Sequence, residues 1–149
     1  MSTFGMPCTG TQFAQIDAAA NPHNAARIRH EFADWLGRHF TLDATKASDV
    51  VLAVNEAMAN AAEYAYVTAE QPGAMHVVAD YDRNAATLTV TVTDEGAWRH
   101  ADPATTELRR GRGIPLMKAL TDSAVVDSSP AGTRVCLEWN GINAARARA

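Results

Sequence analysis

An alanine-rich apolar stretch, Val54 to Tyr66 with the sequence "VNEAMANAAEYAY", carries two polar groups at a telling spacing. Glu56 and Asn60 are four residues apart. On a helix, residues four apart lie one turn above each other on the same face, so this carboxylate and this carboxamide project side by side. A buried apolar helix requires neither group, which makes both of them candidate site residues.

A second stretch, "TDEGAW", places Asp94 at the end of an alternating segment, with Gly96 two residues later. A carboxylate fixed at a strand end accepts a hydrogen bond from an exocyclic amine, and a glycine lets a flat ring approach the backbone closely. Taken alone, an aspartate and a glycine here are more typical of an ordinary turn.

A third stretch, "RRGRGIPLM", places Gly111 and Gly113 directly before a predicted helix with Pro115 in its first turn. Unpaired backbone N–H groups at a helix start bind phosphate, and Arg109, Arg110 and Arg112 would strengthen that binding. A glycine linker with solvated arginines explains the motif alone equally well. The sequence contains no Walker motif, G-x-x-x-x-G-K-[ST].

Hydrophobic periodicity predicts the elements that must position these groups. Helical spacing predicts one helix within residues 21–40, a second that begins between Asp43 and Ser48 and runs through Ala65, and a short third within 114–122. Alternation predicts strands at 11–18, 74–82, 86–94, 123–129 and 132–139. The predicted fold class is therefore α+β, a two-layer α/β sandwich with a mixed, mostly antiparallel sheet covered by helices on one face. The polar segment 95–113, between the predicted strand 86–94 and the predicted helix within 114–122, favours a functional loop or lid.

Composition restricts the classes of protein that fit. The chain has 149 residues, is 47% hydrophobic and carries a formal charge of −4, which suits one compact domain without a basic footprint for nucleic acid or an anionic membrane. Cys8 and Cys136 form no C-x-x-C motif, and the longest strongly apolar run, "VVLAV", is too short to span a bilayer. We therefore expect a cytoplasmic protein with a flexible leader at 1–10, one domain at 11–140 and a flexible tail at 141–149.

In this order and spacing, the three stretches resemble the N, G1 and G2 boxes of the GHKL (Bergerat-fold) ATPase superfamily. Together with the closing "GTRVCLEW", they are similar to the anti-sigma factor serine/threonine kinases of the RsbW and SpoIIAB type, over roughly residues 17–139. The resemblance implies a GHKL-type ATP-binding kinase domain that uses ATP and Mg²⁺. It also implies a sigma factor and a STAS-domain anti-anti-sigma factor as partners, and a homodimer, although no stripe in the sequence marks an interface.

The resemblance assigns a role to each matched residue. Glu56 matches the general base that takes the proton of an attacking serine hydroxyl, and Asn60 matches the asparagine that holds the metal. Asp94 matches the residue that reads adenine. The other matched positions are Gly96 and Thr133 beside the adenine, Gly111, Arg112 and Gly113 in the phosphate loop, and Arg109 near the terminal phosphate.

Some features depart from the family pattern or leave other functions open. Tyr64 stands where many relatives have histidine, and Ala97 and Trp98 replace an early second glycine. An ATP-binding regulatory module that acts by partner binding, without phosphoryl transfer, is the alternative to a kinase. A third possibility is a detached ATP-binding domain that serves a separate phosphoacceptor; His30, followed by Glu31, lacks the signature of such an acceptor and is predicted to be a surface residue.

Overall fold

The structure is a computed structural model that describes residues 12–62, 73–95, 114–129 and 132–145. The helices are α1 (Pro22–His39) and α2 (Ala44–Asn60). The strands are β1 (Gln12–Ala19), β2 (Phe40–Thr41), β3 (Ala74–Asp82), β4 (Thr87–Asp94), β5 (Ser123–Ser129), β6 (Gly132–Trp139) and β7 (Asn143–Ala144). Residues 114–120 form a further short helical segment.

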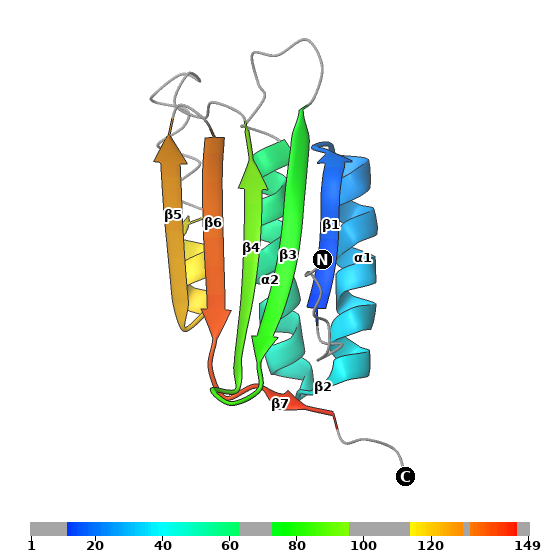
Figure 1. Ribbon diagram of the computed structural model, residues 1–149, viewed down its shortest axis with the longest axis vertical. Helices are drawn as coiled ribbons and strands as arrows, with labels where there is room; N and C mark the ends of the chain where they lie inside the picture. The colour runs from blue at the N-terminus through cyan, green and yellow to red at the C-terminus, as the bar shows by residue number, and fades with distance from the viewer. Residues whose placement is uncertain (1–11, 63–72, 96–113, 130–131, 146–149) are drawn as a thin grey trace, which may run out of the picture.

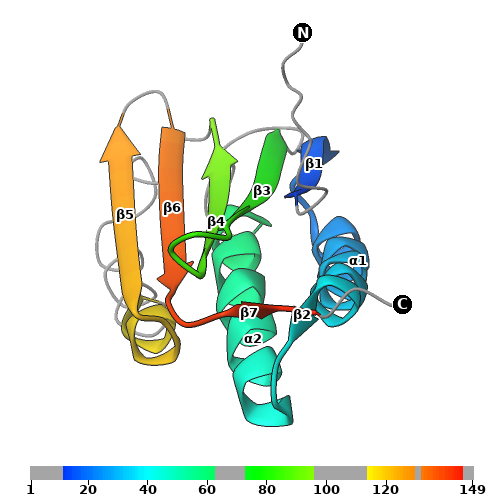
Figure 2. The same cartoon turned by 60° about the horizontal axis from the view of Figure 1, so that its bottom comes forward.

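Five of the strands form one sheet in the order β1-β3-β4-β6-β5, and every neighbouring pair in it is antiparallel. Figure 1 shows α1 and α2 side by side behind this sheet, and Figure 2 shows the same two layers after a turn. The predicted α+β two-layer sandwich is therefore confirmed. Within the described ranges the sheet is wholly antiparallel, without a parallel pair.

Both long helices begin at the side chains that cap them. The Asn21 side chain accepts a hydrogen bond from the backbone N–H of Asn24 at 2.8 Å, and Asp43 Oδ1 accepts from the N–H of Lys46 at 2.7 Å. Each cap satisfies one backbone donor that the first helical turn leaves without a partner. Among the helices that the structure describes, none combines the length and the apolar character needed to cross a membrane.

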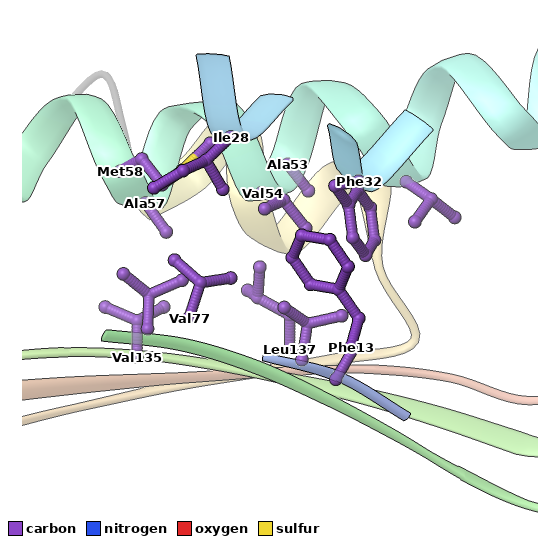
Figure 3. Close-up of a cluster of buried hydrophobic side chains, with 14 of the residues drawn as sticks. Phe13, Ile28, Phe32, Ala53, Val54, Ala57, Met58, Val77, Val135 and Leu137 are labelled. Atoms are coloured by element: carbon purple, nitrogen blue, oxygen red, sulfur yellow. The ribbon is translucent and has the colours of Figure 1, made fainter. Parts of the chain in front are cut away.

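The core lies between the helices and one face of the sheet. Period-2 alternation sends Leu88, Val90 and Val92 of β4 inward, where all three are buried. Figure 3 shows side chains of α1 and α2, including Ile28, Phe32, Val54 and Met58, pointing toward those of the strands, including Phe13, Val77, Val135 and Leu137. This apolar contact orients α2 about its own axis and so decides which of its side chains face the sheet.

The residues that follow β6 correct the predicted domain boundary. Residues 141–145 were expected to belong to a flexible tail, but β7 pairs with β2 in antiparallel register, and Ile142 is fully buried. The Tyr81 hydroxyl donates to the carbonyl of Ile142 at 2.6 Å, and the N–H of Ile142 donates to the carbonyl of Ala86 at 2.9 Å. These contacts make residues 141–145 part of the folded domain.

Replacement of Ile142 tests that boundary. Ile142→Ala removes a fully buried side chain, so the free energy of unfolding should fall by about 2–5 kcal/mol. Leu52→Ala on α2 is the matched control, because Leu52 is 42% exposed and its truncation should cost about 1 kcal/mol or less. Urea unfolding measures both variants. Equal, small losses would mean that residues 141–145 are a tail after all.

Candidate functional site

The ends of several elements meet at one end of the sheet. Both α2 and β4 finish there, as does β5, and β6 starts there (Figure 1). The hairpin between β3 and β4 lies at the opposite end. The side chains of residues 60, 94 and 133, which are far apart in the sequence, are thus brought to this one end of the sheet. This end, where these side chains meet, is called the site edge here.

Buried polar side chains mark this edge. Of the residues that the structure describes, three polar or charged ones are buried: Asn60 is 7% exposed, Asp94 6% and Thr133 2%. All three were predicted as site residues from the sequence. Burial of polar groups costs free energy unless they are hydrogen-bonded, and such groups concentrate where function requires them.

The last turns of α2 carry Glu56 and Asn60. Asn60 lies on the buried stripe of the helix with Ala53 and Ala57, whereas Glu56 is half-buried beside that stripe. The helix does not stop cleanly, because the N–H of Ala61 approaches the carbonyls of both Ala57 and Met58, and residues 61–62 continue in a π-helical turn. Turns of this kind occur often at functional sites. Glu56 and Asn60 lie four residues apart on this one helix, as predicted.

Asp94 and Thr133 lie directly opposite each other across β4 and β6. Gly132, with a φ of +145°, lies against the backbone of Asp94, and a Cβ placed on it would fall 2.0 Å from the Asp94 carbonyl oxygen. Only glycine allows so close an approach. The Thr133 hydroxyl is also 3.3 Å from the hydroxyl of Ser128 on β5, so three strands contribute to this edge.

A shallow hollow opens beside these strand ends. Apart from Gly132, the residues that line it are polar or charged: Thr93, Asp94, Asp127, Ser129, Thr133 and Arg134. Thr93, Arg134 and Asp127 of this lining alternate away from the helices, whereas Asp94 alternates toward them and is only 6% exposed. A much larger cavity, of about 610 Å³, lies between α1 and α2 and is lined mostly by apolar groups such as Leu36, Val51 and Leu52. That cavity lies away from the buried polar residues.

The chain that leaves β4 is held by a histidine. His76 Nε2 lies 3.1 Å from a carboxylate oxygen of Glu95, and the backbone N–H of Asp17 donates to His76 Nδ1 at 3.0 Å. Because Nδ1 accepts, Nε2 carries the proton and donates to Glu95. His76 thus ties the residue after Asp94 to β1, where Asp17 adopts a φ of 61° at an irregularity in the β1–β3 register.

Sequence reasoning missed three residues that support the site. Gly132 appeared only as the start of a strand, His76 as an ordinary solvated or partly packed histidine, and Ser128 not at all. Gly132 and His76 act through contacts with distant parts of the chain, so no local spacing reveals them, whereas Ser128 contacts Thr133 across a hairpin. The one signal in the sequence that pointed to Ser128 was the predicted hairpin between the strands 123–129 and 132–139. In it Ser129 pairs with Gly132, which places Ser128 beside Thr133.

The other predicted site residues lie outside the described residues. These are Gly96, Arg109, Gly111, Arg112 and Gly113, together with the rest of the predicted lid up to residue 113. The segment resumes as the helical residues 114–120, which are anchored by the fully buried Met117 and by the Trp139 Nε1 that donates to the carbonyl of Leu120 at 2.8 Å.

The polar groups at this edge fit a nucleotide and a hard cation. The Asn60 side chain supplies an amide oxygen, which Mg²⁺ accepts as a ligand, and the Asp94 carboxylate accepts hydrogen bonds from an amine. Within the described ranges, no group of three or more His, Cys, Asp and Glu side chains could hold a metal ion.

Comparison with known proteins decides the family. Residues 18–139 match the family described as the histidine kinase-like ATPase domain. The chain belongs to this family. The match spans all three motif stretches and includes Asn60, Asp94 and Thr133, so the predicted membership of the GHKL superfamily is confirmed. ATP binding follows as the family's general property.

A solved structure shares the family's fold. It contains the RsbU and RsbW domains of Rv1364c from Mycobacterium tuberculosis, and it superposes with a TM-score of 0.69 at 23% sequence identity. The alignment covers 92% of this chain and 34% of that one, so this chain spans about a third of its length. The similarity establishes the arrangement of helices and strands in common.

Substitution of Gly132 tests how the site edge is built. Gly132→Ala places a Cβ against the Asp94 carbonyl at a strained φ, so it should destabilise the fold by about 2 kcal/mol or more and weaken ATP binding. Gly37→Ala on α1 is the control, because a Cβ added there would meet nothing within 4 Å, and alanine should stabilise the helix by up to about 1 kcal/mol. Urea unfolding and calorimetric titration with ATP would check both. Unchanged stability in Gly132→Ala would contradict the close approach.

Proposed function

We propose that this chain is an anti-sigma factor serine kinase. It binds Mg-ATP, sequesters a sigma factor and phosphorylates a serine of a STAS-type anti-anti-sigma factor. The observation that carries this proposal is the set of buried polar residues Asn60, Asp94 and Thr133 at one end of a histidine kinase-like ATPase fold, with Glu56 one turn before Asn60.

Adenine recognition is assigned to the edge formed by β4 and β6. The Asp94 carboxylate would accept from the exocyclic amine of adenine, and the Thr133 hydroxyl would complete the polar network beside it. Gly132 holds the two strands at close approach, and His76 holds the chain after Asp94. Gly96 would let the ring lie against the backbone.

The phosphates are assigned to the segment that leads into residues 114–120. Gly111 and Gly113 would present backbone N–H groups, and Arg112 would add positive charge. Asn60 would hold Mg²⁺ through its amide oxygen. When bound, that ion neutralises charge on the phosphate oxygens.

Glu56 and Arg109 are the proposed catalytic residues. As the serine oxygen forms its bond to the terminal phosphorus and the bond to the ADP oxygen breaks, Glu56 would accept the hydroxyl proton. Arg109 would offset negative charge that develops on the transferred group. The half-buried position of Glu56 suits this role, because it lies beside the buried stripe and is not fully within it.

The proposed partners come from the resemblance to the RsbW and SpoIIAB type, and the shared fold with the RsbW-containing structure supports them. The chain is proposed to act as a homodimer in the cytoplasm. Regulation by partner binding alone, without phosphoryl transfer, is the outcome that the experiments below would favour if the kinase proposal fails.

Nucleotide selectivity tests the role of Asp94. Guanine presents a carbonyl where adenine has its amine, so two acceptors would face each other and GTP should bind on the order of 10³-fold more weakly than ATP. Calorimetric titration of the wild-type protein with each nucleotide in magnesium measures the ratio. Equal affinities would refute the assignment of Asp94 to adenine.

A carboxamide at position 56 separates a kinase from a binding module. Glu56→Gln should keep its affinity for ATP and for the STAS partner, while single-turnover phosphoryl transfer falls by roughly 10²- to 10⁴-fold. Asp49→Asn, two turns earlier on the same helix, is the matched control and should transfer phosphate at the wild-type rate. The substrates are STAS-domain proteins encoded in the same genome, assayed with γ-labelled ATP.

Three outcomes would count against the kinase proposal. Equal transfer rates in wild type and Glu56→Gln would remove Glu56 from the role of base. No transfer from wild type to any STAS protein, with ATP binding intact, would favour the regulatory module. Label found on a histidine would favour a domain that serves a separate phosphoacceptor.

A further inference from the structure

A groove, called the helix groove here, runs between α1 and α2. The two helices lie side by side, and no other described element covers them on the side away from the sheet (Figures 1 and 2). Two cavities, of about 610 Å³ and about 150 Å³, lie between them. Arg29 of α1 and Asn55 of α2 line both cavities, so the two cavities form one continuous groove with this polar pair at its middle.

The helix groove is lined by one stripe of residues on each helix, because the lining residues follow one another in steps of three and four. On α1 the stripe includes Pro22, Ala26, Arg29, Ala33 and Gly37, and on α2 it includes Ser48, Leu52, Asn55 and Ala59. All of these residues are half-buried or exposed, whereas those that pack on the sheet, such as Val50 and Val54, are fully buried. The groove is therefore long and open to the surface.

The wider half of the helix groove is apolar. Its cavity is lined by Leu36, Phe40, Val51 and Leu52, and its volume of about 610 Å³ lies within the ~300–1,000 Å³ of specific binding pockets. Leu52 is 42% exposed, and within the described ranges it is the one large hydrophobic side chain that a helix exposes. A large apolar side chain exposed beside such a cavity favours a surface that binds a partner.

The narrower half of the helix groove is lined mostly by alanine: Ala25, Ala26, Ala59 and Ala62. Side chains this small let a third helix approach α1 and α2 closely, toward the lower end of the ~8–10 Å at which helices pack. The two halves thus fit different parts of one partner helix. Large apolar side chains would enter the wider half, and small ones would lie over the narrower half.

Arg29 is the one charged residue among those that line the two cavities. Within the described part of the chain no ion pair joins it to a carboxylate, whereas the neighbouring Arg27 pairs with Glu31 at 3.1 Å. The remaining carboxylates of α1 and α2 line neither cavity: Asp34, Asp49 and Glu56. A half-buried guanidinium among apolar groups is complementary to a carboxylate, which accepts two of its N–H groups at once.

We propose that the helix groove binds an amphipathic α-helix of a partner protein, with its apolar stripe against the wider half and one carboxylate on Arg29. Helices recognise grooves in this way through side chains at i, i+3, i+4 and i+7. An extended segment fits less well, because helix surfaces offer no backbone groups to pair with its own. This inference goes beyond the proposed function. It requires neither ATP binding nor phosphoryl transfer, so it stands or fails separately from them.

A synthetic helical peptide tests the proposal. It has the 18 residues of α1, with leucines at three- and four-residue spacing on one face, a glutamate at the centre of that face, and alanine and glutamine elsewhere. Because Arg29 lies at the middle of the groove, the glutamate reaches it in either direction of the peptide. Binding should shift the backbone amide NMR signals of Ala33, Val51 and Leu52 and leave that of Thr91 on the sheet unchanged. No binding below ~1 mM, or shifts confined to the sheet, would overturn the proposal.

A charge exchange tests the contact with Arg29. Lysine in place of the peptide glutamate, or Arg29→Glu in the protein, should each raise the dissociation constant about 10-fold or more, since like charges in contact cost several kcal/mol. The lysine peptide should recover most of the affinity on Arg29→Glu, which also shows that this variant is folded. Equal affinities of the two peptides for wild type, or no recovery in the exchange, would refute the assignment.

Two further variants separate the apolar contact from general effects of charge. Leu52→Asp places a carboxylate beside the apolar cavity and should weaken binding of the glutamate peptide about 10-fold or more. Arg38→Glu reverses an exposed charge of α1 outside the cavity lining and should leave that affinity unchanged. Circular dichroism confirms that both variants are folded. Equal losses in the two would mean that the peptide responds to net charge and not to the groove.

The same NMR signals distinguish other occupants of the helix groove. If a second copy of the chain fills it, the signals of Val51 and Leu52 should shift with protein concentration in the absence of peptide. If residues 1–11 fill it, Phe4→Ala/Met6→Ala in the full chain should shift them without peptide. Either result would overturn the proposal. Groove signals that ignore both changes and respond to the glutamate peptide would support it.

Discussion

The packing of α2 on the sheet is the contact on which the rest of the architecture depends. Val50, Val54, Ala57 and Met58 are buried against the strands, which fixes the rotation of the helix about its axis. Once that rotation is fixed, Asn60 has to face the interior and Glu56 has to stand at its border. The apolar contact thus positions the polar site, although it takes no part in the chemistry.

The opposite wall of the site follows from a second close contact, between the start of β6 and the end of β4. Gly132 brings the two backbones together without a side chain between them, and Asp94 and Thr133 are opposed as a consequence. Ser128 from β5 and His76 from β3 then restrain the two ends of this wall. A rigid apolar layer therefore supports an edge made of polar groups, as a preorganised binding site requires.

Much of this was predictable from the sequence because the informative signals are local. The strands 74–82, 123–129 and 132–139 have the bounds that alternation and flanking turn residues indicate, and Asn21 and Asp43 cap the helices as their side chains favour. Asn60 stood out because it interrupts an apolar helix and Asp94 because it ends an alternating strand, whereas Thr133 was indicated only by the family resemblance. What the sequence did not reveal depends on distant contacts: Ile142 becomes core only through Tyr81 and Ala86, and His76 gains its partners only when β1 reaches β3.

The position of β1 at the edge of the sheet has a consequence for the order of folding. The β3–β4 and β5–β6 hairpins join strands that are neighbours in the chain, whereas β1 pairs with β3 across α1, β2 and α2, through contacts up to 68 positions apart. Closing so long a loop costs entropy before any contact repays it, so the hairpins form early and β1 docks late. The nascent chain releases β1 first and completes its sheet only after β3 has been made. Until then the edge of β3 stays open, and it is during synthesis, more than in the finished fold, that this protein is most exposed to pairing with the wrong strand.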